Sequence, residues 1–443
     1  MQARTIYLIS PYPERQLWKK KKSIFKLPPF SLFLLKALTP PRYEILLIDE
    51  SQEDIDFTSI NNSIVCISIM TSNAGRGYET ADILKKNGNI IIFGGIHSSA
   101  LPREAVKHAD SVCIGEVENV WIGLLNDIAK NRLKRVYHSR QRPYSSDVPA
   151  VSYIKGSYLV KNLISITRGC PYNCDFCSVS RFFGTKYRKR PLSSAFYDFA
   201  LRGFGMFIVL DDNLTIDRDY FLALCRLIRK LGIRWVGQAS IGALNDEETV
   251  KAMKSCGCSA LLIGIESVSD LDGRAYLKHK SAGTAEDVIK KVHDSGILIH
   301  GSFIFGFDKD SVESFKNTYL FCIENRIETA NFSILVPYPQ TRVLREMVEK
   351  GRMRSFHDWD SFDRLALTFR MKSLEEDVLK KCIIRLYKDF YSLRNILGKI
   401  PLKSLYVFLL YISYTFYYRK GIKKYEEIYS RDSCDMAGSG GNK

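Results

Sequence analysis

Short apolar segments alternate with amphipathic segments along most of this chain, and this alternation restricts its fold more than any other feature. In the first 130 residues, strand-like runs occur at TIYLIS, YEILLID, SIVCISIM, NIIIFGG and SVCIGE. Helical patterns lie between them, such as SLFLLKAL, GRGYETADILKKNG and VWIGLLNDIAK. The alternation predicts an α/β fold in which helices cover both faces of a parallel sheet.

A second series of the same kind follows a polar, basic segment that we interpret as a linker. Its strand patterns are LISITR, MFIVLD, IRWVGQAS, SALLIGIE, LIHGSFIFG and NFSILVP. Six such β/α units predict a barrel or part of one, with its chemistry at the carboxyl ends of the strands. A helical pattern then replaces the strands, and the last residues are typical of a disordered tail. We therefore expect a doubly wound domain, a linker, a partial barrel, a helical region and a tail, at residues 1–130, 131–161, 162–345, 346–430 and 431–443.

One apolar stretch near the C-terminus, residues 405–418, has two interpretations. It holds no charged residue, and Lys403, Arg419 and Lys420 flank it. It is shorter than the roughly 20 residues that a membrane-spanning helix needs. Its tyrosines and flanking cations suit a membrane interface, whereas a run of this length also suits a buried helix that caps the barrel.

Cysteine usage and charge narrow the classes of protein. The chain has eleven cysteines, an odd number, and its N-terminus lacks the pattern of a signal peptide. We therefore expect a cytoplasmic protein with reduced thiols and a metal site rather than disulfides. The net charge of +17 suits an anionic membrane surface, an acidic substrate or nucleic acid, and it also suits simple solubility.

Three of the cysteines stand together in the segment RGCPYNCDFC, directly after a predicted strand. Cys170, Cys174 and Cys177 have the spacing C-x3-C-x2-C. Zinc sites usually have four ligands in two pairs, and the CGC at 256–258 has the wrong spacing for a second pair. Three thiolates can instead hold three irons of a 4Fe-4S cluster. Ordinary clusters have four cysteine ligands, so a trio leaves one iron open to another molecule.

With Phe176 as its aromatic residue, this segment is C-x3-C-x-Φ-C, the signature of radical S-adenosylmethionine enzymes, and the chain resembles them over about residues 1–390. The resemblance implies that the open iron binds the amino and carboxylate groups of S-adenosylmethionine. The cluster then donates an electron, and a 5′-deoxyadenosyl radical abstracts hydrogen from the substrate. No residue is identified that performs a further catalytic step.

Motifs at later strand ends resemble the adenosylmethionine contacts of the same family. These are DDNLT, GQAS, GIES and GSFIFGFDKD, with the glutamate of GIES implied at the ribose hydroxyls. Taken singly, such residues also serve as helix caps or ion-pair members. PYPQT has Gln340 where the family usually has glycine, so we expect a less tightly turned loop and assign it no role. The implied contacts are Phe176, Asp211, Asp212, Asn213, Ser240, Glu266 and Ser267.

The N-terminal half resembles the cobalamin-binding domain that precedes many such barrels. The similar stretches are LPPFSLFLLKAL, SIMTSNAGRGYETADILKK and FGGIHSSALPREAVKHADSVCIGEVENVW. Glycines at its strand ends suit the close approach of a flat macrocycle. The D-x-H-x-x-G motif is absent, which implies cobalamin without a histidine on cobalt, and an empty domain is the alternative. The implied contacts are Thr71, Ser72, Gly94, Gly95, His97, Gly115 and Glu116.

The fold class that results is α/β: a Rossmann-like cobalamin-binding domain, a partial (β/α)6 TIM-like radical S-adenosylmethionine barrel and a helical C-terminal region. The arrangement resembles hopanoid-type lipid methylases and relatives from bacteriochlorophyll synthesis. It implies a cobalamin-dependent C-methyltransferase that acts on an unactivated carbon of an apolar, lipid or tetrapyrrole-like substrate. One adenosylmethionine would remethylate cobalamin and a second would form the radical, with flavodoxin or ferredoxin as electron donor.

Three alternatives remain beside methyl transfer. The first is radical carbon–carbon coupling or cyclisation, which adds no methyl group to the product. The second is an RNA-modifying methylthiotransferase, which needs further cluster cysteines and an RNA-binding module that this sequence lacks, so we expect no nucleic acid partner. The third is a non-catalytic iron–sulfur or cobalamin sensor. For the main interpretation we expect a protein at the inner face of the membrane or free in the cytoplasm.

Overall fold

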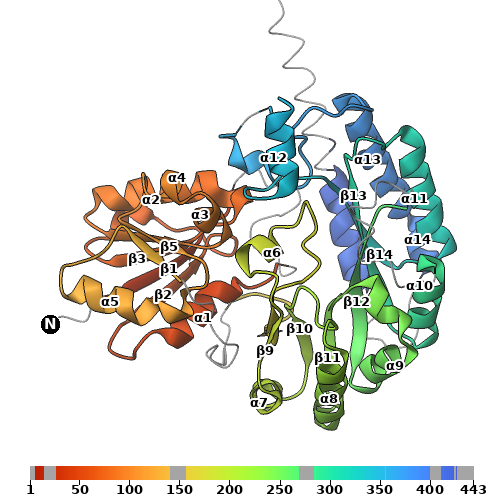
Figure 1. Ribbon diagram of the computed structural model, residues 1–443, viewed down its shortest axis with the longest axis horizontal. Coiled ribbons are helices and arrows are strands. Elements are labelled where there is room, and N and C mark those ends of the chain that lie inside the picture. Colours follow the sequence, from red (N-terminus) through yellow and green to blue (C-terminus); the bar gives the residue numbers. More distant parts are fainter. Residues whose placement is uncertain are drawn as a thin grey trace, which may run out of the picture.

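Two six-stranded sheets dominate the computed structural model, and they lie beside each other with the segment of the cysteine trio between them (Figure 1). The sheets follow the two series of apolar runs. The structure describes residues 5–13, 26–139, 156–268, 284–354, 356–399, 411–423 and 426.

The N-terminal sheet is wholly parallel, with the strand order β2-β1-β3-β4-β5-β6. The order reverses between β1 and β3, so the sheet is doubly wound as expected. Its strands are β1 (Ile6–Ser10), β2 (Ile45–Asp49), β3 (Ile64–Ser68), β4 (Ile90–Gly94), β5 (Ser111–Ile114) and β6 (Val136–His138). Strand β6 lies within residues 131–161, which we interpreted as a linker. We did not predict this strand, because it is short and its apolar pattern is weak.

Strand side chains alternate between the two faces of this sheet and meet different helices. On one face, Ile9, Val65 and Ile67 share a core with α2. On the other face, Leu8 and Cys66 share a core with α1 and α5. The helices are α1 (Phe30–Leu38), α2 (Ala74–Lys86), α3 (Ile96–Ala100), α4 (Pro102–Ala105) and α5 (Trp121–Ala129).

The second sheet is also parallel and has the order β14-β13-β12-β11-β10-β7. Among the described strands β14 and β7 do not pair, so the sheet is an open, partial barrel as the sequence predicts. Its strands are β7 (Asn162–Ile164), β10 (Met206–Val209), β11 (Arg234–Ala239), β12 (Cys258–Glu266), β13 (Leu298–Phe305) and β14 (Thr329–Ile334). Its helices are α7 (Leu192–Arg202), α8 (Arg218–Ile228), α9 (Glu247–Ser255), α10 (Ala285–Asp294) and α11 (Val312–Glu324).

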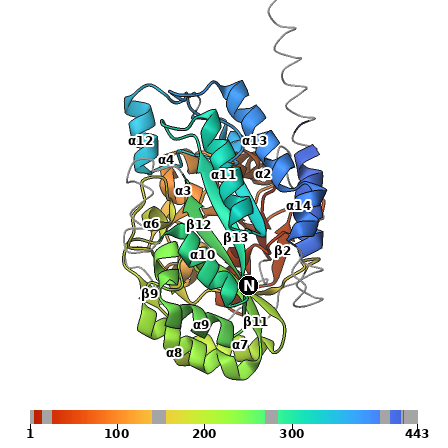
Figure 2. The ribbon, with the colours of Figure 1, turned by 90° about the vertical axis from the view of Figure 1, so that its right-hand side faces the viewer.

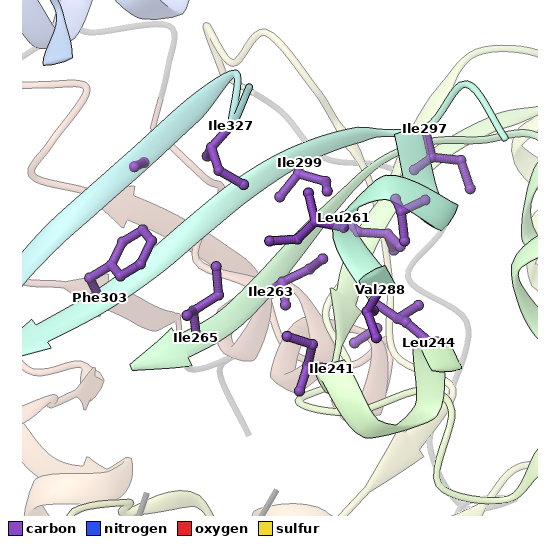
Figure 3. Packing of buried hydrophobic residues seen from close by; sticks show 14 of the residues in the cluster. Ile241, Leu244, Leu261, Ile263, Ile265, Val288, Ile297, Ile299, Phe303 and Ile327 are labelled. Atoms are coloured by element: carbon purple, nitrogen blue, oxygen red, sulfur yellow. The ribbon is translucent and has the colours of Figure 1, made fainter. Parts of the chain in front are cut away.

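The alternation of side chains along the barrel strands separates a helix-facing core from a hollow interior. Leu261, Ile263 and Ile265 of β12 pack outward among the side chains of β13 and of the surrounding helices, including Val288 of α10 (Figure 3). The residues between them face the opposite way, as the period of two requires. The packed face stabilises the barrel, and the inner face is left to line a cavity.

Helices of the C-terminal region cover the edge of the barrel at β14. Helix α13 (Glu376–Phe390) runs beside α11 (Figure 2). The Tyr387 hydroxyl accepts a hydrogen bond from Phe332 N at 2.9 Å, and the Tyr391 hydroxyl donates to Ala330 O at 2.7 Å. Such capping occupies backbone groups that an edge strand would otherwise expose. The remaining helices are α12 (Arg342–Glu349) and α14 (Leu393–Gly398).

The apolar stretch at 405–418 is helical where the structure describes it, and one side of that helix packs inward. Residues 405–410 lie outside the described part, and a helix covers 411–423. Tyr411 is buried and its hydroxyl donates to Ile396 O at 3.1 Å, while Tyr418 stacks on Tyr391. One side of this helix is thus buried, as in a capping helix, while Ser413 and Phe416 are exposed, Phe416 by 50%. Searched over the described residues, the chain has no helix with the length and apolar character to cross a membrane.

Candidate functional site

The loop that carries the cysteine trio leaves the barrel after β7 and is held by backbone bonds. A short ribbon of β8 (Thr167–Arg168) and β9 (Arg188–Lys189) closes its base, and α6 (Val179–Phe182) follows the last cysteine. Cys170 N donates to Gly184 O at 3.1 Å. Gly169 has φ +87°, and a Cβ there would lie 2.4 Å from Lys186 O, so only glycine fits this turn.

The three cysteines face one large cavity of about 660 Å³ at the mouth of the barrel. Thiol sulfur is the donor that iron–sulfur clusters require, so the donor set fits a cluster with three protein ligands. Within the described residues, no three cysteine, histidine or acidic side chains converge closely enough for a single metal ion. The cavity wall includes Gln238, Leu262, His300, Ser302, Asn331, Ser333, Tyr338, Arg364, Tyr387, Tyr414, Tyr417 and Tyr418.

Most of the expected adenosylmethionine contacts line this cavity. Phe176 does so from the loop 169–187 that carries the cysteine trio, here called the cluster loop. Asp212, Asn213, Ser240 and Glu266 do so from the ends of β10, β11 and β12. Among them, the Ser240 hydroxyl is buried and has no protein hydrogen-bond partner. An unsatisfied buried hydroxyl is costly, so it fits a site that a ligand completes.

Asp211 and Ser267 are not among the residues that line the cavity. The Asp211 carboxylate instead accepts bonds from Ile166 N and Thr167 N, both at 2.7 Å, and from the Thr167 hydroxyl at 2.6 Å. Burial raises the pKa of Asp211 to about 7, and the three hydrogen bonds oppose that rise. This side chain therefore fixes the backbone just before the cluster loop. The Ser267 amide donates to Ile265 O at 2.8 Å, so Ser267 belongs to the turn that ends β12.

Glu266 reaches the cavity through an irregular strand end. The pairing of β12 with β13 shifts between Gly264 and Glu266, and Glu266 has φ +65°. A left-handed conformation costs a non-glycine residue roughly 1 kcal/mol or more. Bulges of this kind often re-aim a side chain beside a functional site, which is what the position of Glu266 in the cavity wall suggests here.

The PYPQT loop turns tightly despite its glutamine, so our expectation of a looser loop is wrong. Gln340 adopts φ +66°, the conformation that glycine favours. Its side-chain amide donates to Ala100 O of the N-terminal half at 3.1 Å. The Thr341 hydroxyl then accepts from Leu344 N at 3.2 Å and caps α12. The contact with Ala100 offsets part of the backbone strain.

A second, smaller cavity lies between the end of the N-terminal sheet and the cluster loop. Its volume is about 180 Å³, and Gly94, Gly95, Gly115 and Glu116 line it as expected. No heavy atom lies within 4 Å of the place where a Gly94 Cβ would stand, so the backbone is open to a close ligand. The wall is mostly apolar and includes Leu34, Leu35, Trp121, Arg168, Phe182 and Phe183. These residues fit the edge of a corrin ring.

Thr71, Ser72 and His97 are not in the wall of this cavity, so the structure does not bring these three expected cobalamin contacts to it. His97 is fully buried, with Nε2 3.1 Å from the Tyr78 hydroxyl and 3.5 Å from a Glu104 carboxylate oxygen. Its ring also meets the edge of Trp359. The histidine thus joins the α2 face of the sheet to the C-terminal region, and the GGIH context could not reveal this because Trp359 is distant in sequence.

Glu116 connects the two halves of the protein. Its carboxylate lies 2.6 Å from Arg168 Nη1 and 2.7 Å from Arg188 Nη2, and Glu118 also pairs with Arg168. Each of these side chains is at most 10% exposed. Arg168 directly precedes Gly169, so the ion pairs hold the base of the cluster loop against the end of β5. The sequence suggested a ligand contact for Glu116 but not this role.

Several cavity residues were missed at the level of sequence. His300 and Asn331 face inward on β13 and β14, where His300 Nε2 lies 3.0 Å from Asn331 Oδ1. Burial lowers the pKa of His300 to about 4, so its ring is neutral at pH 7. The sequence signal that could have identified His300 and Asn331 was the presence of polar residues at alternate positions of LIHGSFIFG and NFSILVP. Nothing in the sequence places Arg364 or the tyrosines of 411–423 here.

Comparisons with known proteins agree with this geometry. The model of the radical SAM superfamily matches residues 164–322. The chain is 33% identical over 398 residues to bacteriochlorophyllide d C-12(1)-methyltransferase of Chlorobaculum tepidum, covering 85% of each chain. It is 31% identical to the C-8(2)-methyltransferase of the same organism, covering 85% of this chain and 87% of that one. Among solved structures, the chain is similar to the radical S-adenosylmethionine methyltransferase TsrM from Kitasatospora setae, which was solved with cobalamin and a [4Fe-4S] cluster bound. The TM-score is 0.64 at 16% identity, and the match covers 79% of this chain and 78% of that one.

The chain belongs to the radical S-adenosylmethionine superfamily. Within it, the chain belongs to the family of the bacteriochlorophyllide d methyltransferases, and its two-sheet fold is similar to that of TsrM. It is therefore an enzyme that uses a 4Fe-4S cluster and S-adenosylmethionine on a small-molecule substrate.

Proposed function

We propose that this enzyme is a cobalamin-dependent C-methyltransferase that acts on an unactivated carbon of an apolar, tetrapyrrole-like substrate. One observation carries the proposal: the segment 168–183 lines both cavities. Its cysteines face the larger cavity, while Arg168, Phe182 and Phe183 face the smaller one. A methyl donor in the smaller cavity and a hydrogen-abstracting group in the larger one would then approach one substrate from adjoining sites.

The assignment of residues is part of this proposal. Cys170, Cys174 and Cys177 hold the cluster, which supplies the electron that cleaves adenosylmethionine. Phe176, Asp212, Asn213, Ser240 and Glu266 bind adenosylmethionine, and Gly94, Gly95 and Gly115 let a corrin approach the sheet. The Glu116 carboxylate keeps the two sites at a fixed separation through Arg168. The tyrosine-lined wall excludes water from the substrate.

The substrate class rests on the wall of the large cavity and on the relatives. Tyr387, Tyr414, Tyr417 and Tyr418 present aromatic surface, and β13 and β14 present hydrogen-bonding groups. This combination suits a flat, mostly apolar molecule with a few polar substituents. The curated relatives named above are methyltransferases of bacteriochlorophyllide d. A lipid substrate would use the same aromatic wall but leaves the polar groups of β13 and β14 without a partner.

Product mass tests the proposal. Anaerobically reconstituted protein with cobalamin, a reductant and S-adenosylmethionine labelled with deuterium in its methyl group is incubated with bacteriochlorophyllide d. We expect 5′-deoxyadenosine and a product that carries the label. Deoxyadenosine with an unlabelled, coupled or cyclised product would favour radical coupling instead. Electron paramagnetic resonance of the cob(II)alamin form checks the cofactor separately, and no nitrogen splitting from a histidine is expected.

Electron supply and membrane attachment are further parts of the proposal. For electron supply, the proposal includes a one-electron donor to the cluster, such as flavodoxin or ferredoxin. Support for attachment to an anionic membrane comes from the net charge of +17 and from the exposed side of the helix 411–423, where Phe416 is 50% exposed. Flotation with anionic and neutral liposomes at low and high salt tests it. Flotation only with anionic liposomes at low salt supports attachment, and absence of flotation in every condition contradicts it.

A further inference from the structure

Arg364 stands in the wall of the large cavity, in the segment that follows the 3-10 turn Trp359–Ser361. Of the described residues that line this cavity, it is the one with a permanent positive charge. His300 is neutral at pH 7 for the reason given above. Among the described residues of the cavity wall, Arg364 is thus the fixed cation, and its side chain is exposed.

The backbone of Arg364 is held in an unfavourable conformation. Its φ is +75°, in the left-handed region that non-glycine residues avoid. Its carbonyl accepts a hydrogen bond at 2.7 Å from the amide of Ile334, the last residue of β14. The preceding Asp363 carboxylate accepts from Leu365 N at 2.8 Å and from Ala366 N at 3.0 Å. Several bonds thus impose a strained conformation that carries the side chain toward the cavity, as is common at ligand-binding positions.

Among the described residues, the guanidinium of Arg364 has one hydrogen-bond partner. Its Nε donates to the Tyr338 hydroxyl at 3.3 Å, which is a long bond. Within the part of the chain that the structure describes, no carboxylate lies within ion-pair distance of it. The other arginines at the site differ, since Arg168 and Arg188 both pair with Glu116. The Tyr338 hydroxyl beside it raises the pKa of Arg364. Arg364, Cys177 and Glu266 line the same cavity.

A guanidinium with a fixed position and unused donors matches the planar, two-oxygen geometry of a carboxylate. We propose that Arg364 is the carboxylate-binding residue of this cavity. Two molecules can bring that group. One is the substrate, which would then be an acid that enters with its carboxylate toward Arg364. The other is S-adenosylmethionine. The inference rests on the proposed function only in the choice of a chlorin as the substrate probe.

Binding measurements on four variants test the inference without requiring methyl transfer. Arg364→Gln removes the charge, Arg364→Lys keeps charge without the forked donors, and Arg364→Gly removes the side chain and relieves the strained φ. Arg345→Gln, on the exposed side of α12, is the matched control. Each reconstituted protein is titrated with S-adenosylmethionine and its methyl ester, and with bacteriochlorophyllide d and its methyl ester.

Loss of a charge-assisted pair should weaken binding of the free acid roughly 10- to 100-fold in Arg364→Gln, with partial recovery in Arg364→Lys. The ester should bind equally to wild type and variant. An effect confined to the chlorin acid identifies the substrate as the source of the carboxylate, and one confined to adenosylmethionine identifies the cofactor. If Arg364→Gln and the control bind all four molecules as wild type does, the inference is wrong.

The glycine variant separates a binding role from a structural one. Because glycine adopts positive φ without strain, Arg364→Gly should raise the thermal midpoint by about 1–3 °C while losing discrimination between acid and ester. A lower midpoint together with unchanged discrimination would mean that Arg364 serves the fold instead. Since these are equilibrium measurements, a protein that binds the acid selectively but transfers no methyl group would contradict the proposed function and leave the inference intact.

Discussion

Replacing Glu116 by glutamine tests whether ion pairs between the two sheets hold the cluster loop in place. The Glu116 carboxylate lies 2.6 Å from Arg168 Nη1 and 2.7 Å from Arg188 Nη2, with side chains 3%, 10% and 9% exposed. Glutamine keeps the shape but is neutral, and one carboxylate oxygen becomes an N–H donor that faces a guanidinium. Two buried cations then lose a shared anion, although Glu118 still pairs with Arg168.

The expected magnitude follows from the burial of this cluster. Removing one partner of a buried ion pair costs about 3–5 kcal/mol, because the remaining charge stays out of water. The retained Glu118 places the expected loss near the lower end, at about 3 kcal/mol of unfolding free energy. Arg168 and Cys170 are separated by one residue, so we also expect Glu116→Gln to hold less iron after reconstitution.

Urea unfolding followed by circular dichroism, under anaerobic conditions, measures the loss, and iron analysis measures the cluster. Glu247→Gln is the matched control, because Glu247 pairs with Lys251 on the surface and both side chains are more than 60% exposed. Exposed pairs contribute about 0–1 kcal/mol. If the two variants lose equal stability and Glu116→Gln keeps a full cluster, the ion pairs do not position the loop.

Three further predictions concern single residues. The cluster of about four irons should be lost in each of the variants Cys170→Ala, Cys174→Ala and Cys177→Ala. It should remain in Cys225→Ala and Cys322→Ala, whose cysteines lie in α8 and α11. Iron and sulfide analysis measures the cluster, and a full cluster in Cys174→Ala would contradict the assignment. The pKa of His300 falls from 6.5 to about 4 on folding, so its contribution to the free energy of unfolding is fully present above pH 6.5 and is lost as the pH falls from 6.5 through 4. The His300 ring signals in nuclear magnetic resonance should accordingly not titrate between about pH 8 and 5. Gln340→Gly relieves a positive φ but loses the hydrogen bond to Ala100, so the free energy of unfolding, measured by thermal denaturation, should change by less than about 1 kcal/mol. A loss above about 2 kcal/mol would show that the Ala100 contact outweighs the strain.

The sequence by itself determined the two parallel sheets and their order along the chain, and it placed three thiols on one loop. Strand and helix periodicity is local, and so is the requirement that thiols for one cluster stand close together on one loop. The strand-end segments near Asn213, Ser240 and Glu266 were likewise predictable, because parallel strands present their carboxyl ends at one edge. Strand β6 was missed because three residues give too short a pattern.

Only the tertiary structure decided what each polar residue at a strand end does. Asp211 and Asp212 are neighbours in sequence, yet one fixes the backbone before the cluster loop and the other lines the cavity, because side chains of adjacent residues point in different directions. His97 packs on Trp359 and Glu116 pairs with Arg168 across the halves of the protein. Such contacts join residues far apart in the chain, so they depend on how the two sheets pack against each other, which local periodicity does not encode.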